Sequence, residues 1–436
     1  PSFLLAAVGV LLATALSWVP ALHIYNVAGL VILGATTLGD ALPAEHVAML
    51  FLGMVTGYGV LNTVPSVFLS VPDDSTVFIV LPGQTYLRQR RGYEAAVLCG
   101  LGSLGGIAVL ALLTPVASSL LPTLRAILQP HLHWILWTII AYLFLSEWPK
   151  GSDRAPPGWR RWWDGWRSLT AGLATFLLSG LLGFILLYRS VIPVDVAYQN
   201  LLPAFIGLFA VPSLLQNIVS RMELPHQHIA RSIDVTPGLI AQGTFAGALG
   251  GLFAALFPVV TGGIGGLLAG HATAQRDSRL FIISQGASKL IYYVGAFLLF
   301  FVPRVHLTRG GMAWMLSSLW TAHTPHTYYL AVAVMIFSGV LAFLSLLLMA
   351  RLVARLICAV DCRRISLGTL ALMLIIVVGV TGWGGLLACV VATGIGLIPV
   401  LWGSRRMNGM GVLLLPLALN MIGLGGTVAG WLGLIQ

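Results

Sequence analysis

The stretch YYLAVAVMIFSGVLAFLSLLLMA, from Tyr328 to Ala350, contains no charged residue. A bilayer core about 30 Å thick takes roughly 20 apolar residues as one helix, so this stretch predicts a membrane-spanning helix. Similar unbroken runs recur from Phe3 onward, whereas a membrane β-barrel would show short segments of alternating hydrophobicity. We therefore expect an all-α polytopic membrane protein with roughly ten to twelve membrane elements.

The composition supports the same class of protein. Apolar residues make up 58% of the chain and charged residues 8%, and the mean hydropathy is +0.95. A water-soluble fold cannot hide that much apolar surface. Residues 1–436 are predicted to form a single transmembrane domain, in which the apolar N-terminal run is a first membrane helix, since it lacks the basic region of a secretory signal.

Basic residues exceed acidic ones, which gives a formal net charge of +10. They are spread over short loops between apolar runs, as the positive-inside rule predicts for a membrane protein, and this pattern argues against nucleic acid as a partner. The one long polar stretch, residues 148–167, mixes basic residues with tryptophan. We expect it to be a cytoplasmic loop that anchors the bundle at the lipid headgroups.

Motifs for enzymatic chemistry are missing from the sequence. The four cysteines are scattered without CxxC spacing, which indicates neither a disulfide framework nor a metal site. The histidine pairs HLH (residues 131–133) and HQH (residues 226–228) do not match HExxH, and neither GxSxG nor a Walker A sequence occurs. We therefore expect no catalytic residues, no cofactor and no metal, and the protein is predicted not to be an enzyme.

Two apolar runs are interrupted in the same way. Pro20 is followed by the polar residues His23 and Asn26, and Pro258 is followed by Thr261, Gly262 and Gly263. Proline removes a helical hydrogen bond, and freed backbone groups at membrane depth must be buried in protein or line a wet cavity. Secondary transporters use paired broken helices of this kind at a central substrate site. We therefore predict two pseudo-symmetric, inverted repeats, residues 1–200 and 201–436, although proline kinks also occur in many membrane helices without such a role.

Residues 62–96 contain a third interruption. The apolar piece VFIVL within it is too short to span a bilayer, so a re-entrant hairpin is expected. Ser66 lies in this segment, in a Val-Pro-Ser motif that is repeated at residues 211–213. Asp73 and Asp74 are candidates for binding a coupling cation, Na⁺ or H⁺, or else cap a half-helix that starts at Ser75.

Lys289 lies well inside an apolar stretch. An ionisable side chain there costs about 3 kcal/mol or more by insertion scales, so it usually faces a cavity or a partner. On a helix, Gln285 neighbours both Ser288 and Lys289, and the three side chains could line one wall of a substrate site. The alternative is a lysine that extends to the membrane interface.

These segments resemble the large membrane subunit of tripartite tricarboxylate transporters, the TctA family, and in particular its stand-alone, archaeal-like branch. The resemblance is carried by PALHIYNVA (residues 20–28), by VPSVFLSVPDDSTVFIVLPGQTYLRQRRGYEA (residues 64–95), by GALGGLFAALFPVVTGG (residues 247–263) and by GSRRMNGMGVLLLPLAL (residues 403–419). The chain departs from the family pattern at Ala21 and Val259, where glycine is expected, and at Lys289, where a neutral amide is expected.

The resemblance implies an inverted-repeat carrier of organic acids in the cytoplasmic membrane of a prokaryote. We therefore predict a secondary transporter that works by alternating access and is coupled to an ion, and in which Lys289 holds an organic anion. The residues predicted to bind the substrate are His23, Asn26, Ser66, Thr261, Gly262, Gly263, Gln285, Ser288 and Lys289. Two alternatives stay open: a polyprenyl-phosphate lipid translocase on the same fold, and a non-transporting subunit of a larger membrane complex. The expected partners are a small organic anion or anionic lipid, membrane lipids, and a second copy of the chain or a small membrane subunit.

Overall fold

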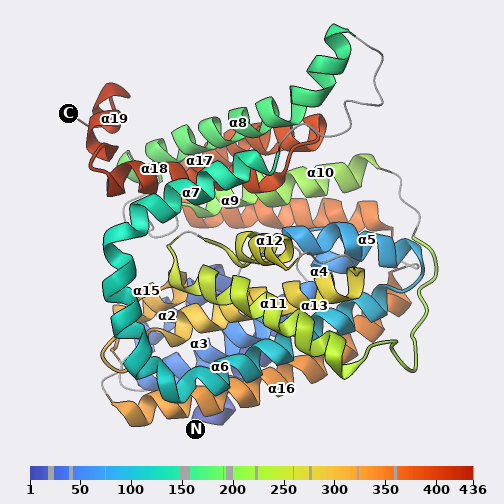
Figure 1. Ribbon diagram of the computed structural model, residues 1–436, viewed down its shortest axis with the longest axis vertical. Coiled ribbons are helices and arrows are strands. Elements are labelled where there is room, and N and C mark those ends of the chain that lie inside the picture. The colour runs from blue at the N-terminus through green and yellow to red at the C-terminus, as the bar shows by residue number, and fades with distance from the viewer. Residues whose placement is uncertain are drawn as a thin grey trace. The chain divides into compact units, whose positions relative to one another are not determined.

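The computed structural model describes residues 1–17, 24–38, 43–73, 75–147, 158–189, 191–192, 200–220, 224–258, 260–273, 277–321, 324–357 and 361–435. Within these ranges the protein is helical and has no β-strand (Figure 1), which confirms the all-α prediction. Eight helical runs among these residues are long and apolar enough to cross a membrane. The protein is a multi-pass membrane protein.

Two of the eight runs are much longer than one crossing needs. Gly92–Leu145 has 54 residues and Arg363–Trp402 has 40, whereas about 20 residues cross a bilayer. Each of these runs exceeds the length that one crossing needs. The bent pair Arg406–Met421 and Gly425–Trp431 passes the same test if it is counted as one span, which brings the number of candidate spans among the described residues to nine.

The helices pack into two compact units. Unit 1 contains residues 1–125 and 221–365, and unit 2 contains residues 126–220 and 366–436. Each unit takes helices from both sides of residue 200, so the packing does not follow the boundary that we predicted between the repeats. Because packing and symmetry are separate properties, the repeat itself stays a prediction.

Unit 1 contains most of the predicted site residues. Its helices are α1 (Ser2–Leu16), α2 (Ile24–Leu38), α3 (Ala44–Leu61), α4 (Thr63–Phe68), η2 (Val77–Ile79), α5 (Val80–Arg88), most of α6 (Gly92–Leu128), α11 (Pro237–Leu256), α12 (Gly262–Ala272), α13 (Ser278–Leu290), the π-helical turn η7 (Ile291–Gly295), α14 (Ala296–Leu298), α15 (Gly310–Ser317) and α16 (Pro325–Leu356). The short helices α4 and α5 pack on each other, as expected for a helical hairpin.

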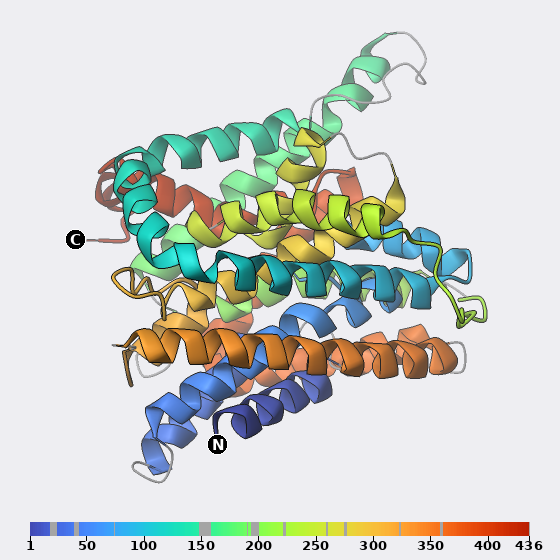
Figure 2. The ribbon, with the colours of Figure 1, turned by 60° about the horizontal axis from the view of Figure 1, so that its bottom comes forward.

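Glycine allows helices of unit 1 to approach at backbone distance. A Cβ atom on Gly53 of α3 would lie 2.1 Å from the carbonyl oxygen of Ala6 in α1, and a Cβ on Gly102 of α6 would lie 1.9 Å from that of Ile283 in α13. Membrane helices associate largely through such close packing, since lipid is as apolar as their side chains. Helix α16 packs beside α1 and α3 (Figure 2).

The predicted break at Pro258 is present. Helix α11 ends at Leu256, α12 begins at Gly262, and Thr261 caps α12 by accepting a hydrogen bond from the backbone N–H of Ile264 at 3.4 Å. Arg309 donates to the carbonyl oxygens of Ala254 and Ala255, both at 3.0 Å. A cation thus satisfies carbonyl groups at the C-terminal end of α11, where the helix dipole favours positive charge.

Unit 2 is built on the same kind of packing. Its elements are η3 (Gln129–His131), α7 (Leu132–Leu145), α8 (Trp159–Tyr188), α9 (Leu202–Phe205), the π-helical turn η6 (Ile206–Ala210), α10 (Val211–Val219), most of α17 (Cys362–Trp402), η8 (Arg406–Met410), α18 (Gly411–Met421) and α19 (Gly425–Trp431). Gly183 and Gly411 bring α8 and α18 together, because a Cβ on either glycine would lie within 2.2 Å of a carbonyl oxygen of the other helix.

The basic, tryptophan-rich stretch differs from the loop that we predicted. Residues 148–157 lie outside the described ranges, but residues 159–167 form the first turns of α8. Trp159 and Trp162 stack at 4.7 Å between ring centroids and are 73% and 50% exposed. Their spacing of three residues places both rings on one side of a helix. This spacing indicates a helix at residues 159–162.

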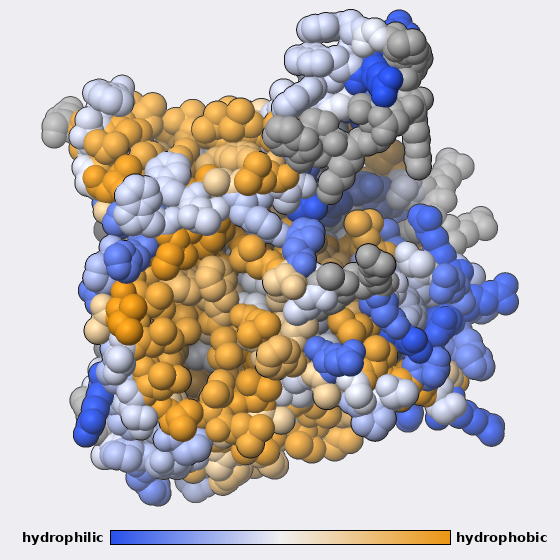
Figure 3. Space-filling model, in the orientation of Figure 1, coloured by the Kyte–Doolittle hydropathy of each residue, from blue (hydrophilic) through white to orange (hydrophobic). Residues whose placement is uncertain are grey.

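Exposed apolar side chains cover the outside of unit 1. Leu112 of α6 and Phe245 and Leu249 of α11 are each about half or more exposed. Figure 3 shows apolar surface over these two helices in the orientation of Figure 1. Such a surface suits contact with lipid chains rather than with water.

Candidate functional site

Helices α3 and α4 follow each other along the chain, and the regular helical pattern is interrupted where they meet. Helix α3 ends at Leu61 and α4 starts at Thr63, so Asn62 lies between them. Pro65 follows closely, and proline has no N–H to offer to the preceding turn. The carbonyl oxygen of Val60, in the last turn of α3, accepts from the backbone N–H of Asn62 and from Thr63 Oγ1, the latter at 2.7 Å.

The ammonium group of Lys289 fills this position. Its Nζ atom donates to Asn62 Oδ1, to Thr63 Oγ1 at 2.5 Å and to Val60 O at 3.4 Å. The side chain is 0% exposed. An ammonium group has three N–H donors, so all three are taken by protein oxygens. We refer to these three oxygens as the oxygen cage.

Asp73 lies on the other side of Asn62. Its Oδ2 accepts from Asn62 Nδ2 at 2.9 Å and from the hydroxyl groups of Tyr58 and Tyr293, both at 3.0 Å. Its Oδ1 accepts from the backbone N–H groups of Ser75 at 3.0 Å and Thr76 at 2.9 Å, and from both hydroxyl groups at 2.8 Å. Asp73 therefore caps the turn that leads into η2. It is also linked to the ammonium group of Lys289 through the side chain of Asn62.

Asn62 connects the two charges. Its side-chain oxygen Oδ1 accepts from Lys289 and its side-chain nitrogen Nδ2 donates to Asp73. This orientation gives both ends of the carboxamide a hydrogen-bond partner. Lys289 and Tyr293 are four residues apart on α13 and η7, so they project from one side toward this cluster. Ser66, another predicted site residue, lies 2.8 Å from both Asn62 O and Thr76 Oγ1 and is buried.

The N-terminus of α12 lies directly beside Lys289. A Cβ on Gly262 would be 2.9 Å from the Cα of Lys289, so only glycine fits without a shift of the backbone. Ser288 donates to the carbonyl oxygen of Gly262 at 3.0 Å. Thr261, Gly262 and Gly263 are buried, and they bring the positive end of the α12 dipole to the middle of unit 1.

Gln285 is one turn before Ser288 and Lys289 on α13. Its side chain is 1% exposed, and neither its Oε1 nor its Nε2 has a hydrogen-bond partner among the residues that the structure describes. It packs against Gly266, where a Cβ would lie 2.5 Å from Oε1. A buried carboxamide without partners costs about 1–3 kcal/mol, which indicates that this amide is placed to meet a ligand or water.

The structure thus brings together Ser66, Asp73, Thr261, Gly262, Gly263, Gln285, Ser288 and Lys289 within unit 1. The other three predicted site residues cannot be placed: His23 and Asp74 lie outside the described residues, as does the side chain of Asn26. Sequence reasoning did not single out Asn62, Thr63, Tyr58 or Tyr293. For Asn62 a signal was present, because it stands three residues before Pro65 at the end of an apolar run.

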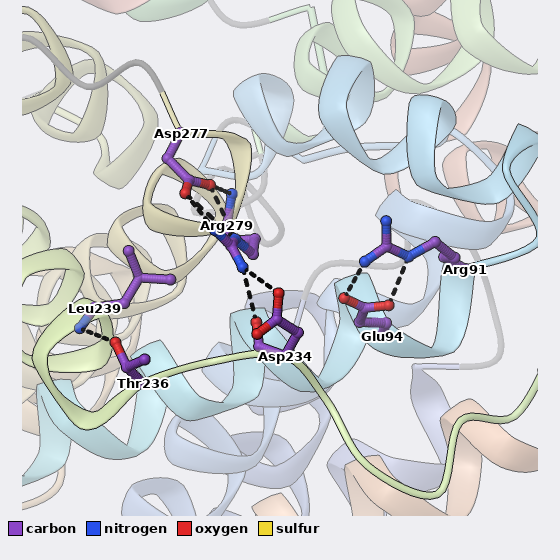
Figure 4. A network of polar contacts seen from close by, with 7 residues as sticks. All are labelled: Arg91, Glu94, Asp234, Thr236, Leu239, Asp277 and Arg279. Carbon is purple, nitrogen blue, oxygen red and sulfur yellow. Dashed lines mark hydrogen bonds and ion pairs between the residues drawn. The ribbon is translucent and has the colours of Figure 1, made fainter.

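A second polar network lies at the N-terminal ends of α6, α11 and α13 (Figure 4). Arg279 pairs with Asp234 at 2.7 Å and with Asp277 at 2.9 Å, and Thr236 caps α11 through the N–H of Leu239 at 3.2 Å. Hydrogen bonding from Arg279 lowers the pKa of Asp277, which caps α13. Arg91 donates hydrogen bonds to Glu94, and these bonds raise the pKa of Arg91. The pair of Arg279 with Asp234 fixes the segment of residues 224–236 to the start of α13.

Unit 2 also places a cation on its Val-Pro-Ser motif. Arg406 donates to Ser213 Oγ and to Gln216 Oε1, the latter at 2.7 Å. Buried Glu147 accepts from the backbone N–H of Arg405 and from Asn408 Nδ2, the latter at 3.1 Å. The serine of each Val-Pro-Ser motif is thus buried, and each motif lies beside a basic side chain of its own unit.

Comparison with known proteins agrees with these features. The model of the tripartite tricarboxylate transporter TctA family matches residues 3–411. An uncharacterized protein of Methanocaldococcus jannaschii is 25% identical over 419 residues, which cover 95% of this chain and 97% of that protein. No solved structure matches the chain significantly. Because the family model spans nearly all of the sequence, the chain belongs to the tripartite tricarboxylate transporter TctA family.

Proposed function

We propose that this protein is a secondary carrier that moves a small carboxylate across the membrane by alternating access. Membership of the family makes it a transport component. The observation that carries the proposal is the carboxamide of Gln285, which has no partner among the described residues and packs against Gly266, one turn after the N-terminus of α12. Broken helices of carriers direct such N-termini at the anionic group of the substrate.

The proposed carboxylate contacts come from two elements. The backbone N–H groups of Gly262 and Gly263 begin α12, and Thr261 caps it. Helix α13 contributes Gln285, whose Nε2 can donate to a carboxylate oxygen. Ser288 helps to hold the two elements together through Gly262, so its proposed role is to position α12.

Lys289 contributes its charge to the proposed site without a direct bond in the described arrangement. Each of its N–H donors already has a protein oxygen as partner. A direct bond to substrate, as predicted from the sequence, would require one of these bonds to break during the transport cycle. Its positive charge nevertheless favours an anion near Gly262, whose backbone packs on the backbone of Lys289.

The test is ligand binding and uptake with the Gln285→Leu variant, which keeps the side-chain volume and removes both polar atoms. Citrate and succinate serve as tricarboxylate and dicarboxylate probes. We expect one of them to raise the melting temperature of the purified wild type and to enter proteoliposomes. The variant should bind it about tenfold or more weakly, the loss expected for one hydrogen bond to a charged group.

The matched control is Ser338→Ala. Ser338 lies on α16, is 0% exposed and also carries a buried oxygen to which no described residue is hydrogen-bonded. Its removal should leave carboxylate affinity unchanged. Equal affinity of Gln285→Leu and wild type would remove Gln285 from the site, and failure of every carboxylate tested to bind would overturn the proposed substrate class.

A further inference from the structure

Lys289 places a full positive charge where water does not reach it. It lies on α13 within the apolar run Ser278–Leu298 and is 0% exposed. A buried charge is tolerated when hydrogen bonds and an opposite charge compensate for lost hydration. The burial of this charge therefore has a cost in hydration free energy that the surrounding groups must offset.

The oxygen cage has the composition of a site for a monovalent metal ion. Its members are a backbone carbonyl at the C-terminal end of α3, an amide oxygen and a hydroxyl oxygen, which are hard ligands suited to alkali cations. Thr63 Oγ1 donates its own hydrogen to Val60 O at 2.7 Å, so its lone pairs are left for the cation. Carriers commonly bind coupling cations with the carbonyl ends of broken helices.

A counter-charge for this cation is also built in. Asp73 is joined to the oxygen cage through the single residue Asn62. The carboxylate itself is held by donors from three separate segments: α3, the turn before η2, and η7. A cation in the cage therefore lies one residue away from a partly buried carboxylate, and the attraction between the two charges stabilises both.

The ammonium group cannot leave as a free ion would. Lys289 belongs to a helix whose backbone is packed at glycine contacts on α6, α11 and α12. We propose that Lys289 acts as a tethered cation that permanently occupies a sodium-type site formed by Val60 O, Asn62 Oδ1 and Thr63 Oγ1, so that this carrier does not use Na⁺ at that position. This inference rests on the proposed function only in calling the protein a carrier. That Lys289 occupies a sodium-type site does not depend on transport.

The test is the sodium dependence of the melting temperature of the full-length purified protein, with choline chloride added to keep ionic strength constant. Lys289→Ala removes the tether and leaves room for an ion and water, whereas Lys289→Met removes the charge and keeps the volume. We expect Lys289→Ala to gain at least about 3 °C between 0 and about 100 mM Na⁺, as a site-bound ion of millimolar affinity would give. Wild type and Lys289→Met should show no such gain.

A second substitution tests whether the sodium-dependent rise in melting temperature comes from the oxygen cage. Thr63→Val has nearly the same shape but no oxygen, so Lys289→Ala combined with Thr63→Val should lose the sodium response. Absence of a response in folded Lys289→Ala would overturn the proposal, and so would a response that survives Thr63→Val.

Wild type keeps the proposal falsifiable if Lys289→Ala does not fold. The melting temperature of wild type and of Thr63→Val should respond equally to sodium, because the cage of wild type holds no Na⁺. A sodium response of wild type that is lost in Thr63→Val would overturn the tethered-cation proposal. Because the melting measurements need no transport, a positive sodium result without any uptake would reject the carrier function and leave the cage intact.

Discussion

At the scale of single residues, Asp73 is the group on which the buried polar cluster depends. Its Oδ2 receives three side-chain donors, from Tyr58, Asn62 and Tyr293. Asp73→Asn would turn an amide N–H₂ group toward some of these donors and remove the counter-charge of Lys289. We expect a loss of about 1.5–3 kcal/mol in the free energy of unfolding, the range for hydrogen bonds to a charged group. Denaturant unfolding in detergent measures it.

The control for this change is Asp234→Asn. Asp234 also pairs with a cation, Arg279, but its side chain is 85% exposed. Exposed pairs contribute little, so the expected loss is at most about 1 kcal/mol. Comparable effects of the two substitutions would contradict the view that the hydrogen bonds to the partly buried Asp73 make it important.

The residues of the site could be predicted in part from the sequence. Lys289, Gln285 and Ser288 stand out because a charge and two polar groups interrupt an apolar run at helical spacing. Their partners do not stand out, since the bond from Lys289 to Thr63 joins residues 226 positions apart. No local pattern encodes such a pairing, which depends on how α3 and α13 pack.

At the scale of helices, glycine contacts fix α13 in place. A Cβ on Gly286 would lie 2.0 Å from the carbonyl oxygen of Cys99 in α6, and the reciprocal contact joins Gly102 to Ile283. Gly286→Ala must therefore push two backbones apart. We expect a loss of about 1–3 kcal/mol or more in the free energy of unfolding, together with displacement of Lys289 from the oxygen cage.

Gly34→Ala is the matched control for this prediction. Gly34 lies within α2, and a Cβ there would meet nothing within 4 Å. Alanine should be neutral or stabilise the protein by up to about 1 kcal/mol, because it has fewer conformations to lose on folding. The packing argument fails if Gly286→Ala is as stable as Gly34→Ala in the same thermal unfolding assay.

The helices were easier to predict than the connections between them. The break at Pro258 could be predicted because proline and glycine act on the local backbone. The charges and tryptophans of residues 159–167 predict a loop from composition, whereas the structure shows the start of α8, in which Trp159 and Trp162 have helical spacing. The composition of a segment indicates whether it meets water, lipid or protein, whereas the spacing of its apolar and polar residues indicates whether it is helical.

At the scale of the whole molecule, unit 1 has one strongly basic end. Hydrogen bonds tie the turn around Arg90 to residues 224–236, and Arg279 and Arg351 join the same end through Asp234 and Tyr93. The far end of α6 carries Arg125, which donates to Val305 O. By the positive-inside rule, the end that contains Arg90 is expected to face the cytoplasm.

Cysteine labelling along α16 tests this orientation. Arg355 and His326 lie near opposite ends of this helix of 32 residues, and both side chains are exposed. In a background without native cysteines, Arg355→Cys should react with a membrane-impermeant maleimide only after the membrane is opened. His326→Cys should react in intact cells, and the reverse pattern would invert the assignment.

The predicted halves and the observed units divide the chain differently for a physical reason. Hydropathy and proline spacing follow the order of the sequence, whereas compact packing joins whichever helices have matching faces. Helix α13 packs against α3 and α11 although α3 lies in the predicted first half. Fold class could therefore be predicted from the sequence, and the grouping of helices could not.

The contact between Cys99 and Thr63 has a practical consequence. The thiol sulfur lies 3.3 Å from Thr63 Oγ1, which is itself a member of the oxygen cage. The stretching vibration of a thiol absorbs infrared light in a region where other protein groups are nearly transparent, and its frequency follows hydrogen bonding. The protein thus carries a native vibrational label at its centre, one that can report in real time whether an ammonium group, a metal ion or water fills the neighbouring position.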